Sequence, residues 1–286
     1  MTPSKYRALV AQSPADRDGL RPAQENKYLA VWEFVHGVEE VRSTPVTLQI
    51  ARTNSCNFRC VYCSDHRAGN QIPRTSISDA VWHENLGVVE RAEVLAFHGI
   101  SEFMIDKDFF PIVEGCAAAG AMLSLNTNGS VCTERHLAVL AGYPGTINMN
   151  FSLDAATPEM FARIRGWDFL RVLDNVRAYV ECFRPRRDRT LLTLSFVITR
   201  TNVLEMVPFV YLAKALGVDG IHYWRLHEYD GLDWSVETRD GAIFHYRKET
   251  AGNFIEEYNR QIETTRRVAE IVGMDAELPH PETVPR

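Results

Sequence analysis

The chain has 286 residues, of which 45% are hydrophobic and 24% charged, and its net charge is −6 at pH 7. This composition is typical of a folded, water-soluble protein with one large core or two modest ones. The acidic balance argues against binding of nucleic acid or anionic membranes through bulk charge, and no apolar stretch approaches the roughly 20 residues that span a bilayer.

The predicted elements begin with an N-terminal extension over residues 1–45, in which residues 25–40 have a helical pattern. After Pro45, short β-branched or apolar runs alternate with longer amphipathic segments. Such runs are typical of parallel strands that are buried on both faces. Six of them predict strands, at 46–52, 94–99, 121–129, 147–154, 191–199 and 221–226.

Several helix ends can be predicted between these strands. Thr157 is a predicted N-cap with Pro158 at the first helical position, and Asn202 with Glu205 has the spacing of a capping box. Left-handed C-caps are predicted at three glycines that follow helical segments: Gly120, Gly217 and Gly273.

Six successive strand–helix units predict an α/β fold with parallel strand pairing. They are too few for a closed eight-stranded barrel, which leaves an open, splayed barrel or a doubly wound sheet. We assign residues 46–230 to this core and residues 231–286 to a C-terminal, partly helical extension. Because polar segments follow every predicted strand, we expect an active face at the carboxyl ends, where His227, Tyr229 and Trp234 could contact a substrate.

Three of the six cysteines follow the first strand, with the spacing Cys56-x3-Cys60-x2-Cys63. A structural zinc site prefers four ligands, so zinc would need a distant fourth ligand such as His66 or His98. A four-iron cluster normally takes four cysteines, and three would leave one iron with an open coordination position. The remaining cysteines are scattered singly and are best explained as buried small side chains.

The segment "CNFRCVYC" resembles the signature of the radical S-adenosylmethionine (radical SAM) superfamily, with Tyr62 as the aromatic residue before the last cysteine. This resemblance implies a partial (β/α)6 barrel. It also implies that Cys56, Cys60 and Cys63 hold a [4Fe-4S] cluster whose fourth iron chelates S-adenosylmethionine (SAM). One electron would then cleave SAM to methionine and a 5′-deoxyadenosyl radical that abstracts hydrogen from a substrate.

Two further segments carry the resemblance. "FHGISEF" is similar to the Gly-Gly-Glu segment after the second strand, which implies that Gly99 and Glu102 bind the SAM ammonium group, although Ser101 stands where a second glycine is usual. "NFSLDAATPEMFARIRG" resembles the fourth-strand region of the SPASM-type subgroup. That likeness implies that Ser152, with Asp154 beside it, lies near the SAM carboxylate and ribose, and that Arg165 counters the carboxylate charge.

The C-terminal segment "AEIVGMDAELPHPETVPR" resembles the one that leads into the auxiliary-cluster domain of SPASM proteins, yet no cysteine follows Cys182. The chain either lacks that domain or was cut ahead of it, so the resemblance implies a SPASM-type core with one cluster and without the auxiliary-cluster cysteines.

The leading hypothesis is a radical SAM enzyme that acts on a peptide or small metabolite and is reduced by an electron donor such as flavodoxin or ferredoxin. The alternative is a structural or redox-sensing zinc or iron–sulfur protein without SAM chemistry. Clustered cysteines, and no apolar signal core at residues 1–22, favour a cytoplasmic protein with no nucleic-acid or membrane partner.

Overall fold

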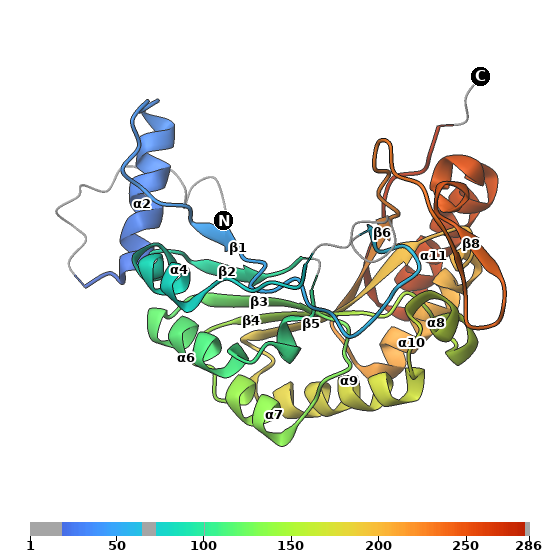
Figure 1. The fold of residues 1–286 in the computed structure, drawn as a ribbon, viewed down its shortest axis with the longest axis horizontal. Helices are drawn as coiled ribbons and strands as arrows, with labels where there is room; N and C mark the ends of the chain where they lie inside the picture. The colour runs from blue at the N-terminus through green and yellow to red at the C-terminus, as the bar shows by residue number, and fades with distance from the viewer. Residues whose placement is uncertain (1–18, 65–72, 100, 284–286) are drawn as a thin grey trace.

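Seven parallel strands form one sheet in the computed structural model, which describes residues 19–64, 73–99 and 101–283 (Figure 1). The sheet is open, because its edge strands do not pair with each other. In spatial order the strands are β1 (Thr47–Gln49), β2 (Val94–Phe97), β3 (Met122–Thr127), β4 (Ile147–Ser152), β5 (Thr190–Ile198), β6 (Gly220–Arg225) and β9 (Asp275–Glu277). All six predicted strands are present, with ends within three residues of the prediction.

Helices cover one face of this sheet (Figure 1). They are α6 (Phe109–Ala119), α7 (Glu134–Ala141), α9 (Phe169–Phe183) and α10 (Met206–Leu216). Strand β4 shows how the sequence encodes the two faces, since buried Ile147, Met149 and Phe151 alternate with partly exposed polar residues. The buried residues join the core against the helices, where Phe151 packs on Tyr179.

The opposite face of the sheet is called the inner face below. Strand register places paired residues of neighbouring strands on the same face, so the polar residues of β4 are joined there by polar residues of β3 and β5. The inner-face residues of these three strands include Ser124, Asn126, Asn148, Asn150, Thr193 and Ser195.

The helix-end predictions have two outcomes. Thr157 caps α8 (Pro158–Arg165) by accepting from Met160 N at 3.3 Å, and the three glycine C-caps adopt left-handed conformations, as predicted. The prediction of a capping box formed by Asn202 and Glu205 is wrong. Asn202 makes no side-chain cap at η4 (Val203–Glu205), because its Oδ1 accepts instead from Thr199 N at 2.8 Å and Thr199 Oγ1 at 2.9 Å. Its Nδ2 donates to the carbonyls of Asp154 and Val197. Glu205 accepts from Ala156 N, on the loop before α8.

The two extensions are helical, as predicted. The N-terminal one contains α2 (Pro22–Val35), and the C-terminal one contains α11 (Ile255–Val272) together with an unpredicted antiparallel hairpin, β7 (Ser235–Glu237) and β8 (Ile243–His245). The remaining helical elements are α4 (Asp79–Glu84), α5 (Leu86–Val89), η2 (Phe103–Ile105), η3 (Arg184–Arg186), η5 (Tyr246–Glu249) and η6 (Ala251–Asn253). The domain boundaries at 45 and 230 remain predictions. Among the described residues, no helix has the length and apolar character that a bilayer crossing needs.

The seventh strand, β9, was not predicted. It has three residues, two of them acidic, so neither its length nor its composition is typical of a buried strand. Its pairing depends on Gly220, where a side-chain carbon would lie 3.3 Å from the carbonyl oxygen of Asp275. The C-terminal extension thereby adds an edge strand to the sheet.

Candidate active site

A cavity of about 220 Å³ contains eight of the nine predicted site residues. The three cysteines of the first loop line it, and the other five are Tyr62, Gly99, Glu102, Ser152 and Arg165. They come from segments that follow β1, β2 and β4 or end α8, so the expected active face is present at the carboxyl ends of the strands. Asp154, the ninth, lies beneath the cavity and does not line it.

The cysteine loop is fixed to the rest of the molecule through Val61. Its backbone N–H donates to Ile164 O at 3.0 Å, and its carbonyl accepts from the indole of Trp234 at 2.8 Å. Trp234 is buried and stacks on Tyr246 with ring centroids 3.7 Å apart. The expectation that Trp234 contacts a substrate is therefore wrong, because the indole is used to anchor the loop.

Nitrogen donors lie near the sulfurs of Cys56 and Cys60. Cys56 Sγ lies 3.4 Å from Phe58 N and 3.9 Å from Asn128 Nδ2, and Cys60 Sγ lies 3.4 Å from a guanidinium nitrogen of Arg165. Burial raises the pKa of both thiols above its ordinary value. Hydrogen bonds to sulfur favour the thiolate, and a bound metal completes deprotonation, so this donor set fits a thiolate-ligated metal centre.

The loop after β3 holds the cysteine loop from the other side. Asn128 Nδ2 donates to Asn57 Oδ1 at 2.8 Å, Asn57 Nδ2 donates to Ser130 Oγ at 2.8 Å, and Ser130 N donates to Asn128 Oδ1 at 2.9 Å. On its sequence alone, the segment "NTNG" (126–129) is most simply explained as a loop. Its place at the carboxyl end of a central strand was the signal that could have identified it.

Glu102 is buried, and its carboxylate accepts from Met104 N at 3.2 Å, Thr127 Oγ1 at 2.9 Å and Asn128 N at 2.6 Å. Burial raises its pKa, and these three donors oppose that shift. A carboxylate offers about four acceptor positions, so three protein donors leave room for a donor from a ligand.

Gly99 stands where the chain leaves β2 to enter the cavity wall. Its φ is +150°, and a side-chain carbon there would lie 3.1 Å from Ala51 Cβ. A side chain would therefore be strained by both conformation and contact. Ser101, which stands where a second glycine is usual, also lines the cavity.

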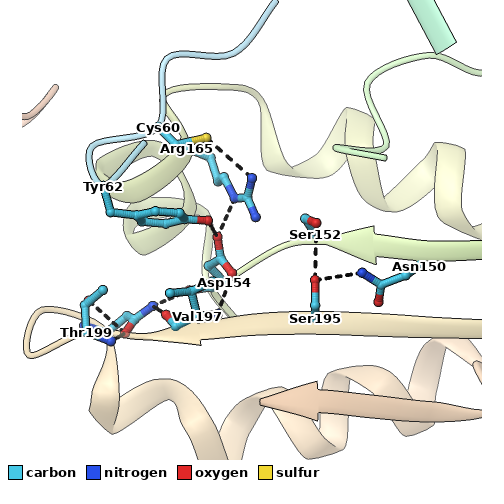
Figure 2. A network of polar contacts seen from close by, with 10 residues as sticks. Cys60, Tyr62, Asn150, Ser152, Asp154, Arg165, Ser195, Val197 and Thr199 are labelled. Atoms are coloured by element: carbon cyan, nitrogen blue, oxygen red, sulfur yellow. Dashed lines mark hydrogen bonds and ion pairs between the residues drawn. The ribbon is translucent and has the colours of Figure 1, made fainter. Parts of the chain in front are cut away.

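Figure 2 shows the network beneath the cavity, centred on Asp154. Asp154 is fully buried with φ +61°, and Oδ1 accepts from Val197 N at 2.7 Å. Oδ2 lies 2.5 Å from Arg165 Nε and accepts a hydrogen bond from the Tyr62 hydroxyl. Since both oxygens are used within the protein, Asp154 orients Arg165 and Tyr62.

The surroundings of Arg165 and Tyr62 fix the protonation state of each side chain. Burial is the largest single influence and lowers the pKa of Arg165, but Asp154, Tyr62 and Cys60 together outweigh it and raise that pKa well above its ordinary value. Burial raises the pKa of Tyr62 well above its ordinary value. Arg165 therefore remains a cation and Tyr62 a neutral hydrogen-bond donor near neutral pH.

Ser152 connects the cavity to the inner face (Figure 2). Its hydroxyl accepts from Ser195 Oγ at 3.2 Å, Ser195 accepts from Asn150 Nδ2 at 3.0 Å, and Asn150 accepts from Thr193 Oγ1 at 3.1 Å. These groups are neutral donors and acceptors. The inner face therefore continues the cavity without adding charge.

The zinc alternative finds no support within residues 19–64, 73–99 and 101–283. In this part of the chain, no three His, Cys, Asp or Glu side chains are grouped closely enough to hold a single metal ion. His98 contacts Ser124 Oγ at 3.0 Å, and His66 lies outside the described residues. A four-iron cluster binds each cysteine to a different iron, so its cysteines need not converge on one point.

Curated relatives of the chain include a probable GTP 3′,8-cyclase of Saccharolobus islandicus, which is 29% identical over 186 residues, or 63% of this chain and 56% of that protein. The molybdenum cofactor biosynthesis protein moc-5 of Caenorhabditis elegans is 29% identical over 181 residues, or 60% of this chain and 28% of that protein. The match thus spans about half or less of these relatives.

Two solved structures share the fold. Streptococcus suis SuiB bound to S-adenosylmethionine has a TM-score of 0.66 at 14% identity, covering 96% of this chain and 59% of that chain. Native anSMEcpe with bound AdoMet and a Cp18Cys peptide has a TM-score of 0.59 at 15% identity, covering 82% and 63%. These likenesses confirm the predicted α/β partial-barrel fold.

The sequence profile of the Radical SAM superfamily matches residues 50–203, more than half of the chain. Members of this superfamily use a [4Fe-4S] cluster and SAM, bind a substrate and need a reductant. The chain therefore belongs to the radical SAM superfamily.

Proposed function

We propose that Cys56, Cys60 and Cys63 hold the [4Fe-4S] cluster, and that the enzyme abstracts a hydrogen atom from a peptide or small metabolite. The observation that carries this proposal is one cavity that joins the three cysteines to a buried carboxylate and a buried guanidinium. When bound, the cluster and SAM supply the electron and the 5′-deoxyadenosyl radical for this abstraction.

The charges of the cavity complement the two charges of a methionyl group. Glu102, with acceptor capacity left over, receives the SAM ammonium, and Arg165 receives the carboxylate together with the Ser152 hydroxyl. Gly99 brings backbone close to the ligand without a side chain in the way. Tyr62 and Asp154 orient Arg165. The Asp154 carboxylate itself does not contact SAM, because both of its oxygens are used within the protein.

The inner face supports a substrate that is recognised by neutral hydrogen bonds. Its positions on β3, β4 and β5 carry amides and hydroxyls, and Asn148 Oδ1 is buried there without a hydrogen-bond partner in the described part of the chain. A triphosphate is normally recognised by several arginine or lysine side chains. The described inner face of these three strands carries neither, which favours a peptide or a neutral metabolite over GTP.

The subgroup and the electron donor are proposed from the sequence. The segment over residues 150–166 supports a SPASM-type core, and we propose a flavodoxin- or ferredoxin-like protein as the electron donor.

Anaerobic reconstitution with iron and sulfide, followed by dithionite and SAM, tests the proposal. We expect about four irons per chain and time-dependent formation of methionine and 5′-deoxyadenosine. A folded chain that assembles the cluster but forms no 5′-deoxyadenosine would contradict the proposed chemistry. One tightly bound zinc per chain that persists during reconstitution would favour the zinc alternative.

A further inference from the structure

We propose that Arg165 sets the reduction potential of the cluster held at Cys60, and that Asp154 and Tyr62 are the positioning residues that keep its guanidinium against the cysteine sulfur. This inference rests on the proposed function, because it requires a cluster at Cys60. It adds a second task for Arg165 that is already performed before SAM binds.

The geometry gives Arg165 little freedom. It is the last residue of α8, its side chain is 8% exposed, and Nη1 lies 3.4 Å from Cys60 Sγ. Nε lies 2.5 Å from Asp154 Oδ2, so one planar group bridges the sulfur and the carboxylate. Figure 2 shows the guanidinium between these two partners.

The carboxylate is itself held in place. Asp154 accepts from Val197 N at 2.7 Å, and its carbonyl accepts from Asn202 Nδ2 at 2.9 Å. Its side chain leaves a left-handed backbone that few residues other than glycine adopt. The Tyr62 hydroxyl donates to the same oxygen that faces Arg165, and the guanidinium lies 5.6 Å from the centroid of the Tyr62 ring. Contacts from β5, from the segment before η4 and from the cysteine loop therefore fix the position of the Arg165 guanidinium.

The electrostatic consequence has a definite sign. Reduction adds one negative charge to the cluster and its thiolates, so a nearby cation stabilises the reduced form and makes the potential less negative. The carboxylate of Asp154 acts in the opposite sense, but it lies on the far side of the guanidinium from Cys60. Because the site is buried, the nearer positive charge dominates with little screening by solvent.

The donors described at the Cys56 sulfur are uncharged. Cys56 receives a backbone N–H from Phe58 and the amide of Asn128, and both groups are uncharged. Arg59, another cation of this loop, donates to the backbone oxygens of Cys56 and Phe58. Arg165 places its charge against a cysteine sulfur, so substitutions at Arg165 should move the potential strongly.

The test is a dithionite titration of the reconstituted protein without SAM, followed by electron paramagnetic resonance of the reduced cluster. The main variant is the double substitution Asp154→Asn/Arg165→Gln, which removes both charges of the buried pair at similar volume and leaves neither unpaired. Arg165→Lys keeps a cation that cannot bridge both partners. Arg163→Gln, on the same helix and paired with Asp240 at the surface, is the matched control.

We expect the double variant to favour the oxidised cluster at least tenfold, which is a shift of about 59 mV to more negative potential for a one-electron couple. Arg165→Lys should shift it in the same direction by less, and Arg163→Gln should leave it unchanged. If the double variant assembles no cluster, Arg165→Lys decides alone, with about a threefold change expected.

A midpoint in these variants equal to that of Arg163→Gln, or a shift to less negative values, overturns the inference. If the wild-type protein assembles a cluster and cleaves SAM, but the midpoint potential does not change in the Arg165 variants, this inference alone fails. If the wild-type protein assembles no cluster, the proposed function fails first.

Discussion

The cavity and the inner face are both polar, but they are built differently. The cavity and the network beneath it concentrate buried charges, with Glu102, Asp154 and Arg165 each less than a tenth exposed. The adjoining inner face has neutral groups at comparable positions, where Asn150, Ser195 and Ser152 bond to one another. The charged part lies at the ends of the strands and the neutral part within them.

This difference indicates which ligand each region is suited to. Buried charges are costly unless they are paired or meet a ligand of opposite charge, so their concentration at the cavity fits a zwitterionic cofactor. Neutral amides and hydroxyls orient a substrate without fixing its charge. If the cavity binds the cofactor and the inner face binds the substrate, substitutions in one region should leave binding at the other unchanged.

The largest effect is expected at a cluster cysteine. Cys60→Ala should abolish cluster assembly and reduce 5′-deoxyadenosine formation by more than about 100-fold, since even outer-sphere substitutions at metal sites cost 10- to 100-fold. Iron content and product chromatography measure both. Cys182→Ala, a half-buried cysteine that donates to Leu137 O on the helix side, should retain the cluster. Equal iron content in the two variants would remove the cavity's assignment as the cofactor region.

The anchor of the cysteine loop should be the next most sensitive position. Trp234→Ala removes a buried indole and its hydrogen bond to Val61 O, with an expected loss of about 3–5 kcal/mol in the free energy of unfolding. Trp224→Ala, at a 52% exposed position on β6, should change it by less than about 0.5 kcal/mol. Urea unfolding compares the two, and similar losses would show that the loop does not depend on Trp234.

A substitution at Glu102 gives the most direct comparison of the cavity with the inner face. Glu102→Gln removes the charge that would face the SAM ammonium and should weaken SAM binding about 10- to 100-fold, as expected for a hydrogen bond to a charged group. Asn150→Ala, on the inner face, should leave SAM binding within about twofold. Isothermal titration of reconstituted protein measures both. If Asn150→Ala weakens SAM binding as much as Glu102→Gln, the two regions are not separate.

The smallest effect concerns the pH dependence of the inner face. Burial lowers the pKa of His98 below its ordinary value of 6.5, so His98 stays neutral in the folded chain as the pH falls. The unfolded chain takes up the proton below pH 6.5, and wild-type stability should therefore fall relative to His98→Gln on acidification. Unfolding free energies at pH 7.5 and 5.5 test this, and a stability difference that does not change between them would contradict a neutral His98.

Much of the sheet could be predicted because each central strand is an apolar run that ends in polar residues, as in β4 and β5. The cavity could be predicted as far as residues carry a motif, which includes the cysteines, Gly99 and Glu102. Strand β9 could not, because its pairing depends on contact with β6 and not on its own composition. The anchoring role of Trp234 and the contacts of Asn128 could not be predicted for a similar reason, since their partners lie far away in the sequence.

The capping-box error has the same cause. The local spacing of Asn202 and Glu205 satisfies the rule, but carbonyl and N–H groups of the loop after β4 lie within reach of both side chains. Tertiary contacts provided better partners than the helix end did.

The left-handed backbone of Asp154 restricts which amino acids this position can accept. Glycine would relax the chain but delete the carboxylate, asparagine would keep the shape but lose the charge, and glutamate would add a methylene in a fully buried site while straining the main chain. Conformation and chemistry thus exclude different substitutes, and aspartate satisfies both demands. Saturation mutagenesis at this codon should consequently yield no replacement that preserves shape and charge together.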